Sequence, residues 1–266
     1  MAHLFIFGLG YTAKRVASRA QALGWRVDAT GSAGNLDFDD DFERVCAHLD
    51  RATHVLSSVP PENVTGGDDV LATYASTLEA AAQRGAFIGY LSSTGVYGDV
   101  GGAWVDESSP TGGGRRSARA EADARWLELG AHVFRLPGIY GPGRSALDRV
   151  RGGKAHRIDL PDQIFSRVHV EDIAGGVMAA MTGDAAPGAY NLADDLPASQ
   201  NAVIEEACRL LDREPPPLQS MDEADLSPMA RGFYAENRRV ANGKAKRMLG
   251  WTLRYPTYRE GLRSLL

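Results

Sequence analysis

Two glycines and an alanine near the start of the chain, in the segment LFIFGLGYTA, have the spacing of a loop that can hold phosphate groups. Gly8 allows a sharp turn, Gly10 lets the backbone approach a ligand without a Cβ in the way, and Ala13 allows the next helix to pack closely. The amino-terminus of that helix adds unpaired N–H groups and a partial positive charge. The spacing therefore predicts a site for a dinucleotide pyrophosphate, with a plain strand-to-helix turn as the alternative interpretation.

Apolar runs and helical patterns alternate along most of the chain. We expect strands at 4–7, 25–30, 54–59, 86–92 and 132–136, and helices at 14–23, 40–50, 68–84, 117–129, 170–181 and 201–211. This alternation predicts an α/β fold in which helices flank a parallel sheet. The glycine loop follows the first strand and precedes the first helix, which is the position that phosphate binding requires.

Composition and charge exclude several classes of protein. A chain of 266 residues, 44% of them hydrophobic, can bury one large core or a core and a small lobe. The net charge of -5 gives no basic excess for nucleic acid. Cys46 and Cys208 lack the spacing of a disulfide framework or a zinc site, so no metal is expected. No apolar run is long enough for a membrane span or a signal peptide, and we expect a cytoplasmic protein.

Four further motifs occur in one order, and a fifth follows them. They are LSSTGVYGD (91–99), RLPGIYGPG (135–143), RVHVEDIA (167–174), YNLADDLP (190–197) and NGKAKRMLGW (242–251). With these motifs the chain resembles the extended short-chain dehydrogenase/reductase family, in its NAD-dependent epimerase/dehydratase branch, over nearly its whole length.

The resemblance implies a Rossmann-like, doubly wound parallel sheet with a smaller carboxy-terminal α/β lobe. Residues 1–143 would bind NAD(P), and residues 144–266 would form the lobe that closes over a small-molecule substrate. Some segments of the second part, about 165–195, are expected to return to the first domain. In the family, dimers often use the helices that match 68–84 and 117–129, so a homodimer is a further expectation.

Family members carry out hydride chemistry with a Ser or Thr, a Tyr that acts as acid/base, and a Lys that lowers the pKa of the tyrosine. The resemblance places Ser93 at the serine and Arg119 at the lysine, with Arg115 where the tyrosine would stand. Arg115 cannot act as an acid/base near neutral pH because a guanidinium keeps its proton. The sequence thus predicts an atypical active site in which Ser93 orients the substrate, unless it merely caps the strand end.

An enzyme with this site needs another group to carry the proton. The candidates within the matching motifs are Tyr97, Tyr140, His169, Asp106 and Glu107. Each has a plainer interpretation, as a ring packed beneath the site, a partner of a backbone carbonyl or a solvated loop acid. We place Tyr140 beside Ser93 and Arg119 as the catalytic candidates. A Thr-Gly pair follows the serine where a nucleotide-sugar dehydratase would have two acids, which counts against dehydration.

The end of the second strand bears on the choice of cofactor. A carboxylate there would bind the ribose 2′-hydroxyl and repel a 2′-phosphate. Thr30 and Ser32 occupy this place, so we predict NADP in preference to NAD. Asp28 lies two residues earlier and would reverse the preference if it stood at the strand end. Lys14 and Arg15 could meet a phosphate or be solvated helix charges.

The predicted cofactor contacts come from the ends of several strands. By resemblance alone, residues 57–59 pass the ribose and pyrophosphate, and residues 137–139 pass the nicotinamide. The full set is Gly8, Leu9, Gly10, Tyr11, Thr12, Ala13, Thr30, Ser32, Ser57, Ser58, Val59, Ser92, Pro137, Gly138 and Ile139.

Two functions from different classes remain open. The first is an NAD(P)-dependent oxidoreductase or epimerase that acts on a hydroxyl or carbonyl of a sugar-like or other small polar substrate. The alternative is a non-catalytic NADP-binding sensor or regulator, which Arg115 favours. The substrate itself is not predicted, because the basic residues of the lobe could meet a phosphate or carboxylate or be surface charges. These residues are Arg144, Arg149, Arg151 and Lys154.

Overall fold

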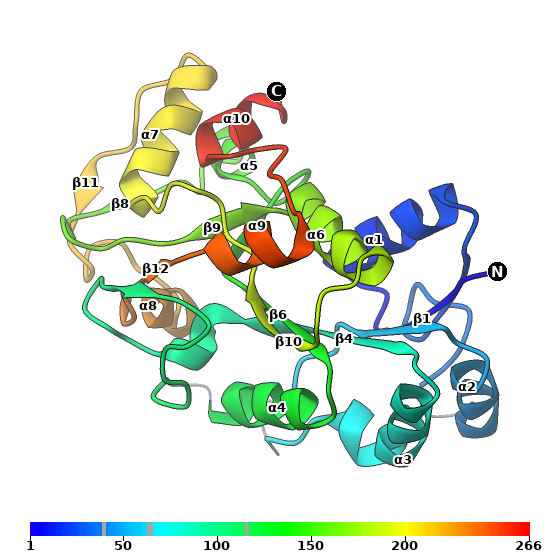
Figure 1. Ribbon diagram of the computed structural model, residues 1–266. Coiled ribbons are helices and arrows are strands. Elements are labelled where there is room, and N and C mark those ends of the chain that lie inside the picture. The colour runs from blue at the N-terminus through cyan, green and yellow to red at the C-terminus, as the bar shows by residue number, and fades with distance from the viewer. Residues whose placement is uncertain (39–40, 63–65, 115–116) are drawn as a thin grey trace.

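The computed structural model describes residues 1–38, 41–62, 66–114 and 117–266, and a six-stranded sheet lies at its centre (Figure 1). Every neighbouring pair in this sheet is parallel. The strand order is β10 (Gly188–Asn191), β6 (His132–Leu136), β4 (Phe87–Ser93), β3 (His54–Ser57), β1 (His3–Phe7) and β2 (Arg26–Ala29). The order reverses between β1 and β3, where doubly wound sheets bind ligands at their carboxyl ends.

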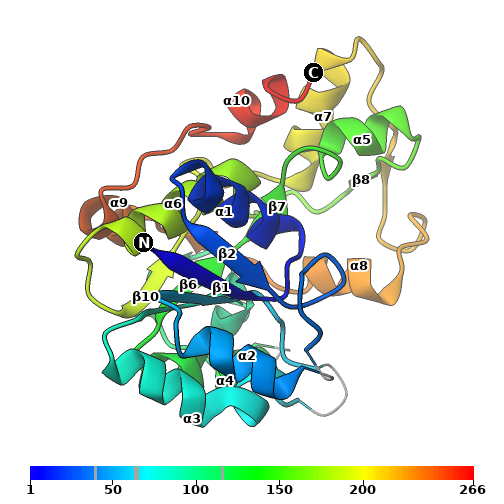
Figure 2. The ribbon, with the colours of Figure 1, turned by 90° about the vertical axis from the view of Figure 1, so that its right-hand side faces the viewer.

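Helices cover both faces of the sheet (Figure 2). One face carries α1 (Tyr11–Ala22), α6 (Val170–Thr182) and α9 (Gly243–Leu249), and the other carries α2 (Phe42–Leu49), α3 (Asp69–Gln83) and α4 (Ser117–Glu128). β1 is apolar throughout its centre because it is buried on both sides. Leu4 and Ile6 pack beneath α1, and Phe5 and Phe7 face the core under α2 and α3.

The later part of the chain builds a second, smaller core. Leu147 from α5 (Ala146–Arg151), Ile204 from α7 (Gln200–Leu210) and Leu262 from α10 (Tyr258–Arg263) meet in it. This part lies beyond the carboxyl ends of β1 and β2 (Figure 2). It also holds the pair β8 (Arg157–Ile158) and β11 (Leu218–Gln219), and the helix α8 (Pro228–Tyr234).

Short elements connect the two parts. β7 (Gly138–Tyr140) pairs with β9 (Arg167–His169), β5 (Trp104–Val105) pairs with β12 (Arg239–Val240), and the 3₁₀ turn η1 (Thr94–Tyr97) follows β4. Although α6 and β10 come late in the chain, α6 packs on α1 and β10 forms an edge of the sheet.

The predicted fold class is confirmed. All five predicted strands are present, and the predicted helices at 40–50 and 201–211 correspond to α2 and α7. The sequence did not predict β10, because its four residues include a glycine and carry too short a pattern. None of the described helices is long and apolar enough to cross a membrane.

Candidate functional site

The glycine loop between β1 and α1 has a backbone conformation that glycine adopts easily and other residues rarely adopt. Gly8 has a φ of 79°, and a Cβ there would lie 2.9 Å from Cγ2 of Val59. Its N–H donates to Oγ1 of Thr30 at 3.2 Å, and its carbonyl accepts a hydrogen bond from the hydroxyl of Ser58. The loop is therefore fixed by the ends of β2 and β3, and position 8 requires glycine.

The amino-terminus of α1 opens onto free space. Gly10 is its N-cap, has an extended backbone and makes no side-chain capping bond, and the first turn contains no acidic residue. A Cβ added to Gly10 would meet nothing within 4 Å. The first N–H groups of a helix have no partner within the helix, so this end can receive an anion. The residues present thus fit a dinucleotide pyrophosphate.

The other residues of the loop have distinct roles. Ala13 is fully buried beneath the helix, and Leu9 donates its N–H to the carbonyl of Thr30 at 3.0 Å. The hydroxyl of Tyr11 donates to the carbonyl of Pro142 at 3.1 Å, and the guanidinium of Arg144 lies 5.9 Å from the centre of the Tyr11 ring. The loop therefore contacts the Gly-Pro-Gly turn that leads into α5. Thr12, at the start of α1, is also buried.

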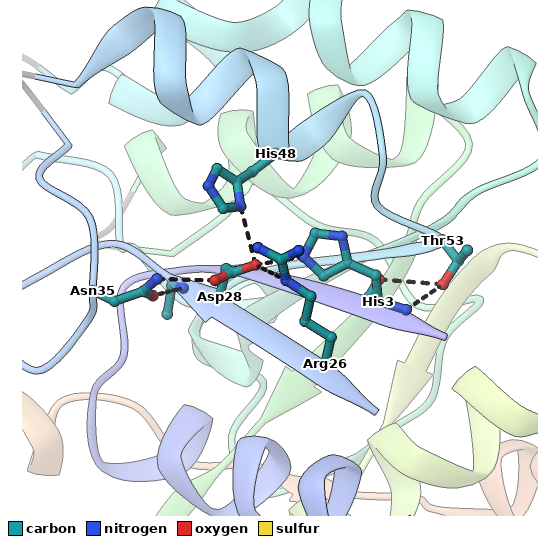
Figure 3. A network of polar contacts seen from close by, with 7 residues as sticks. His3, Arg26, Asp28, Asn35, His48 and Thr53 are labelled. Carbon is teal, nitrogen blue, oxygen red and sulfur yellow. Dashed lines mark hydrogen bonds and ion pairs between the residues drawn. The ribbon is translucent and has the colours of Figure 1, made fainter. Parts of the chain in front are cut away.

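The carboxylate of Asp28 is held inside the protein rather than at the end of β2 (Figure 3). It accepts hydrogen bonds from Arg26 and His3 at 2.8 Å, Asn35 at 2.9 Å and His48 at 3.0 Å. Burial raises the pKa of Asp28, but these hydrogen bonds outweigh it and lower the pKa to about 2. Asp28 is thus an ionised carboxylate that links β1, β2 and α2, and its oxygens already accept four hydrogen bonds from these neighbours.

His3, Asp28 and His48 are also of the residue types that bind metals, and their polar atoms lie within 4.8 Å of one another. However, one carboxylate oxygen of Asp28 already accepts from both histidines and from the guanidinium of Arg26. A metal ion would have to displace that cation, so the geometry is that of a hydrogen-bonded network.

The predicted residues at the ends of β2 and β3 differ in exposure. Thr30 is buried and bound to the glycine loop, whereas Ser32 is exposed. Ser58 and Val59 contact Gly8, but Ser57 is fully buried, and its hydroxyl has no hydrogen-bond partner within the described part of the chain.

The two basic residues after the loop also differ in their surroundings. Lys14 is exposed, and Nε of Arg15 lies 3.6 Å from the carboxylate of Glu171.

Ser92 faces a buried polar network that the sequence analysis missed. Its hydroxyl donates to Asp123 of α4 at 2.6 Å, and Asp123 forms an ion pair with Arg135 of β6 at 2.7 Å. Arg135 also donates to the hydroxyl of Tyr97 at 3.0 Å, and Tyr97 donates to Asn191 at 2.8 Å. The sequence contained one signal for this network, because Arg135 stands within the otherwise apolar strand 132–136 and a buried charge needs a partner.

The catalytic candidates lie on α4, β4 and β7. Ser93 is half-buried, and its hydroxyl accepts the N–H of Gly95 at 3.1 Å, which is the alternative capping role. Arg119 donates to the hydroxyl of Tyr90 at 3.3 Å. Arg115 lies outside the described residues. Arg119 therefore places one positive charge beside β4. It lies at Tyr90, which precedes Ser93 by three residues in that strand.

Tyr140 is packed beneath the later part of the chain. Its side chain is 8% exposed, its ring meets His169 edge-on, and a Cβ on Gly261 of α10 would collide with its hydroxyl. Burial raises the pKa of Tyr140. A phenol in this setting keeps its proton, so the geometry favours packing over acid/base chemistry. Of its neighbours, Pro137 is half-buried, Gly138 is exposed and Ile139 packs against the core beneath α1.

The other proton-carrying candidates are engaged elsewhere. Nδ1 of His169 accepts the N–H of Glu171 at the start of α6, and burial lowers the pKa of His169 to about 4. Asp106 is bound by the Ser108 hydroxyl, which lowers the pKa of its carboxyl. Glu107 accepts the N–H of Asn191 at 2.7 Å on β10, two strands from β4, and burial raises its pKa. Within the described part of the chain, none of these three residues forms a hydrogen bond with Ser93.

Comparisons with known proteins identify relatives at two levels of similarity. No family model matches the sequence. A protein of unknown function from Silicibacter pomeroyi is 41% identical, with 100% of this chain and 98% of that chain covered and a TM-score of 0.87. The chain belongs to the same family as the Silicibacter pomeroyi protein.

More distant solved structures share the fold. A human epimerase family protein, solved with NADPH, is 15% identical, with coverage of 99% of this chain and 98% of that chain and a TM-score of 0.76. UDP-glucose 4-epimerase from Thermus thermophilus, solved with NAD, is 19% identical, with coverage of 99% and 97% and a TM-score of 0.69. The expected resemblance to the NAD-dependent epimerase/dehydratase branch is thus confirmed at the level of the fold.

One curated relative is a 3-diazoavenalumate denitrifying reductase from a Streptomyces species. It is 31% identical over an alignment of 177 positions, and the match covers 60% of this chain and 55% of the relative. This chain therefore matches about half the length of that reductase.

Proposed function

We propose that the protein binds NADP or NAD at the amino-terminus of α1 and uses it as an oxidoreductase on a small polar substrate. The observation that carries this proposal is the open space at Gly10, at a helix end with no capping side chain and no nearby acid. Solved structures of the same fold hold NADPH or NAD, and the curated relative is a reductase. The bound cofactor would supply or accept a hydride.

This chain's own residues would then bind and orient the reactants. The N–H groups at the start of α1 would hold the pyrophosphate, and Ser93 would bind the substrate oxygen once its bond to Gly95 is exchanged. Arg119 would supply the positive charge that the family lysine provides. We prefer NADP, because the carboxylate of Asp28, near the end of β2, is buried in the network of His3 and His48.

Substitution of Gly10 gives a selective test. Gly10→Ala adds a methyl group where a Cβ would meet no atom within 4 Å, and the extended backbone there accepts alanine. The variant should fold, with a small loss from a poorer N-cap, but should bind the dinucleotide weakly because the Cβ occupies the phosphate position. Gly113→Ala is the matched control, since a Cβ at Gly113 also meets nothing within 4 Å.

The measurement is thermal unfolding with NADPH, NADP⁺, NADH and NAD⁺, on protein freed of bound nucleotide. Ligand at 100 times its Kd stabilises by about 2.7 kcal/mol, which raises the Tm of a chain of this size by several degrees. We expect this shift in the wild type and in Gly113→Ala, and its loss in Gly10→Ala. A wild type that responds to none of the four nucleotides would contradict the proposal.

A cofactor-binding sensor is the second candidate, because Arg115 replaces the family tyrosine in the sequence. The double variant Arg115→Tyr, Arg119→Lys separates the two functions in an assay of NADPH oxidation with a panel of aldehydes and ketones. Turnover that appears only in the double variant would identify a sensor on a competent scaffold. Turnover in the wild type would identify an enzyme.

A further inference from the structure

Two neighbouring serines at the end of β4 point to different sides of the sheet. Successive side chains of a strand alternate between its two faces, so the hydroxyls of Ser92 and Ser93 have different surroundings. Ser92 is 5% exposed, and its hydroxyl donates to Asp123 of α4 at 2.6 Å. Ser93 is half-buried and is the N-cap of η1, where its hydroxyl accepts the N–H of Gly95. The buried serine therefore fixes the backbone directly before the catalytic candidate.

An ion pair between α4 and β6 also holds the other end of this turn. Arg135 donates to both carboxylate oxygens of Asp123, from Nη2 at 2.7 Å and from Nε at 3.2 Å. Its Nη1 donates to the hydroxyl of Tyr97, the last residue of η1, at 3.0 Å. The two ionised residues are 4% and 1% exposed, so water does not compete for these bonds. Segment 92–97 is thus attached at both ends to one buried ion pair.

Tyr97 was among the sequence candidates for proton transfer, but its contacts favour a different role. Its hydroxyl accepts from Arg135 and donates its own proton to Oδ1 of Asn191 at 2.8 Å. The guanidinium carbon of Arg135 lies 5.0 Å from the centre of the Tyr97 ring, and Asn191 is fully buried on β10. Burial raises the pKa of Tyr97, so the phenol keeps its proton near neutral pH. Tyr97 has the geometry of an anchor rather than of an acid.

The same ion pair also fixes α4 on β4. Residues four apart on a helix share a face, and so do residues two apart on a strand. Arg119 donates to the hydroxyl of Tyr90 at 3.3 Å. One helical turn later, Asp123 accepts from Ser92, which follows Tyr90 by two residues. Asp123 therefore attaches to the sheet the helix that carries Arg119, the cation of the proposed site.

We propose that Arg135 and Tyr97 are positioning residues for Ser93. They hold the turn that presents its hydroxyl, and Arg135 also holds the helix of Arg119 through Asp123. In this role neither residue touches a reactant. The proposal rests on the proposed function for the role of Ser93, but the position of that hydroxyl can be measured without a substrate. Precise placement matters because a displacement of about 1 Å can lower a rate by about 100-fold.

The test removes one hydroxyl at a time and leaves the ion pair intact. Tyr97→Phe deletes the bond to Arg135 at one end of the turn, and Ser92→Ala deletes the bond to Asp123 at the other end. Both substitutions keep or reduce the volume of the side chain, and the charges of the ion pair still compensate each other, so the variants should fold.

Tyr190→Phe is the matched control. Tyr190 is as deeply buried as Tyr97, and it stands one residue before Asn191 on β10. Its side chain belongs to the core beneath α1 and α6, and its hydroxyl donates to the carbonyl of Ala186. This variant therefore loses a buried phenol hydroxyl on the same sheet without releasing segment 92–97.

The first readout is amide hydrogen exchange at Gly95, whose N–H bonds to the hydroxyl of Ser93. We expect exchange at this N–H to become about fivefold faster or more in Tyr97→Phe and in Ser92→Ala, because each variant loses one bond that holds the turn. Tyr190→Phe should change it by less than about twofold. Denaturant unfolding of the three variants separates this local effect from a general loss of stability.

The second readout is the rate of NADPH oxidation with the panel of aldehydes and ketones. We expect kcat to fall by about tenfold or more in Tyr97→Phe and in Ser92→Ala, whereas KM for NADPH stays within about twofold. The reason for this division is that the cofactor loop lies between β1 and α1, away from the turn that is released. A merely structural role would not separate kcat from KM in this way.

Three results would overturn the proposal. They are an unchanged exchange rate at Gly95 in both variants, the same increase in Tyr190→Phe, and an unchanged kcat in variants of an active wild type. If the wild type oxidises NADPH with none of the panel, the proposed enzymatic function fails. Exchange at Gly95 then still decides whether Arg135 and Tyr97 position the hydroxyl of Ser93.

Discussion

His169 is 2% exposed, and its two ring nitrogens have different surroundings. Nδ1 accepts the N–H of Glu171 as the N-cap of α6, and Nε2 is buried with no hydrogen-bond partner within the described residues. Because burial penalises the imidazolium, the pKa of His169 falls to about 4. This residue, a proton-transfer candidate in the sequence, is neutral at physiological pH.

The lowered pKa of His169 gives a pH dependence. In the unfolded chain the imidazole takes up a proton near pH 6.5, whereas in the folded protein it does so near pH 4. The unfolded state therefore binds more protons between these values, and the free energy of unfolding falls by up to about 3 kcal/mol as the pH drops from 6.5 to 4. His169→Asn keeps an acceptor for the N–H of Glu171 but does not titrate.

Urea unfolding of wild type and His169→Asn at pH 7 and pH 4.5 measures this effect. We expect the wild type to lose more of its stability between the two pH values than the variant does. Equal losses would assign the acid sensitivity to other groups.

At the scale of elements, one carboxylate joins two helices of the same face. Asp68 is the N-cap of α3 and accepts the N–H of Leu71 at 2.9 Å. Its other oxygen accepts the indole N–H of Trp126 on α4 at 2.8 Å, and the Trp126 ring stacks on Tyr90 of β4. Asp68 is 3% exposed, so both bonds are shielded from water.

Removal of the Asp68 carboxylate should lower the stability of the protein. Asp68→Ala loses the cap and leaves the indole N–H buried without a partner, and we expect the free energy of unfolding to fall by about 2–4 kcal/mol. Ser199→Ala is the control, because among the described residues the hydroxyl of Ser199 bonds to the N–H of Ala202 alone, as the cap of α7. It should cost about 1 kcal/mol. Denaturant unfolding that gave the two variants equal losses would show that the bond to Trp126 contributes nothing.

On the scale of the whole molecule, Asp172 of α6 attaches the carboxy-terminal segment to the sheet domain. Its carboxylate accepts the N–H groups of Arg254 at 2.6 Å and Tyr255 at 3.1 Å, and its carbonyl accepts the indole N–H of Trp251 at 3.0 Å. This segment leads into α10, which packs against α7 in the second core. Asp172 thus connects the central sheet with the part that we propose binds the substrate.

An amide at this position cannot accept both backbone bonds. Asp172→Asn leaves one partly buried N–H facing an amide N–H, and the free energy of unfolding should fall by about 1–3 kcal/mol. Hydrogen exchange should become faster mainly in residues 251–266, because their anchor is lost. Glu171→Gln is the control, since its pair with Arg19 is partly exposed. Exchange that rose evenly across the protein would contradict this role of Asp172.

The predicted homodimer through the helices 68–84 and 117–129 stays a prediction. α3 and α4 lie side by side on the same face of the sheet, and both views place them at one side of the molecule (Figures 1 and 2). The predicted division into residues 1–143 and 144–266 is also a proposal. α6 and β10 belong to the second range in sequence but pack on the first sheet.

The sequence by itself determined the parallel sheet and the glycine loop. Strands that are buried on both faces consist of continuous apolar runs. The loop has a positive φ at Gly8 and free space at Gly10, and both conditions favour glycine, so the loop can be found from its residue types. The tertiary structure alone decided which polar groups meet. Asp123 with Arg135, Asp28 with His48, and His156 with Tyr234 are all distant in sequence. Because local patterns record only which face of an element is buried, they cannot tell which partner satisfies a buried charge.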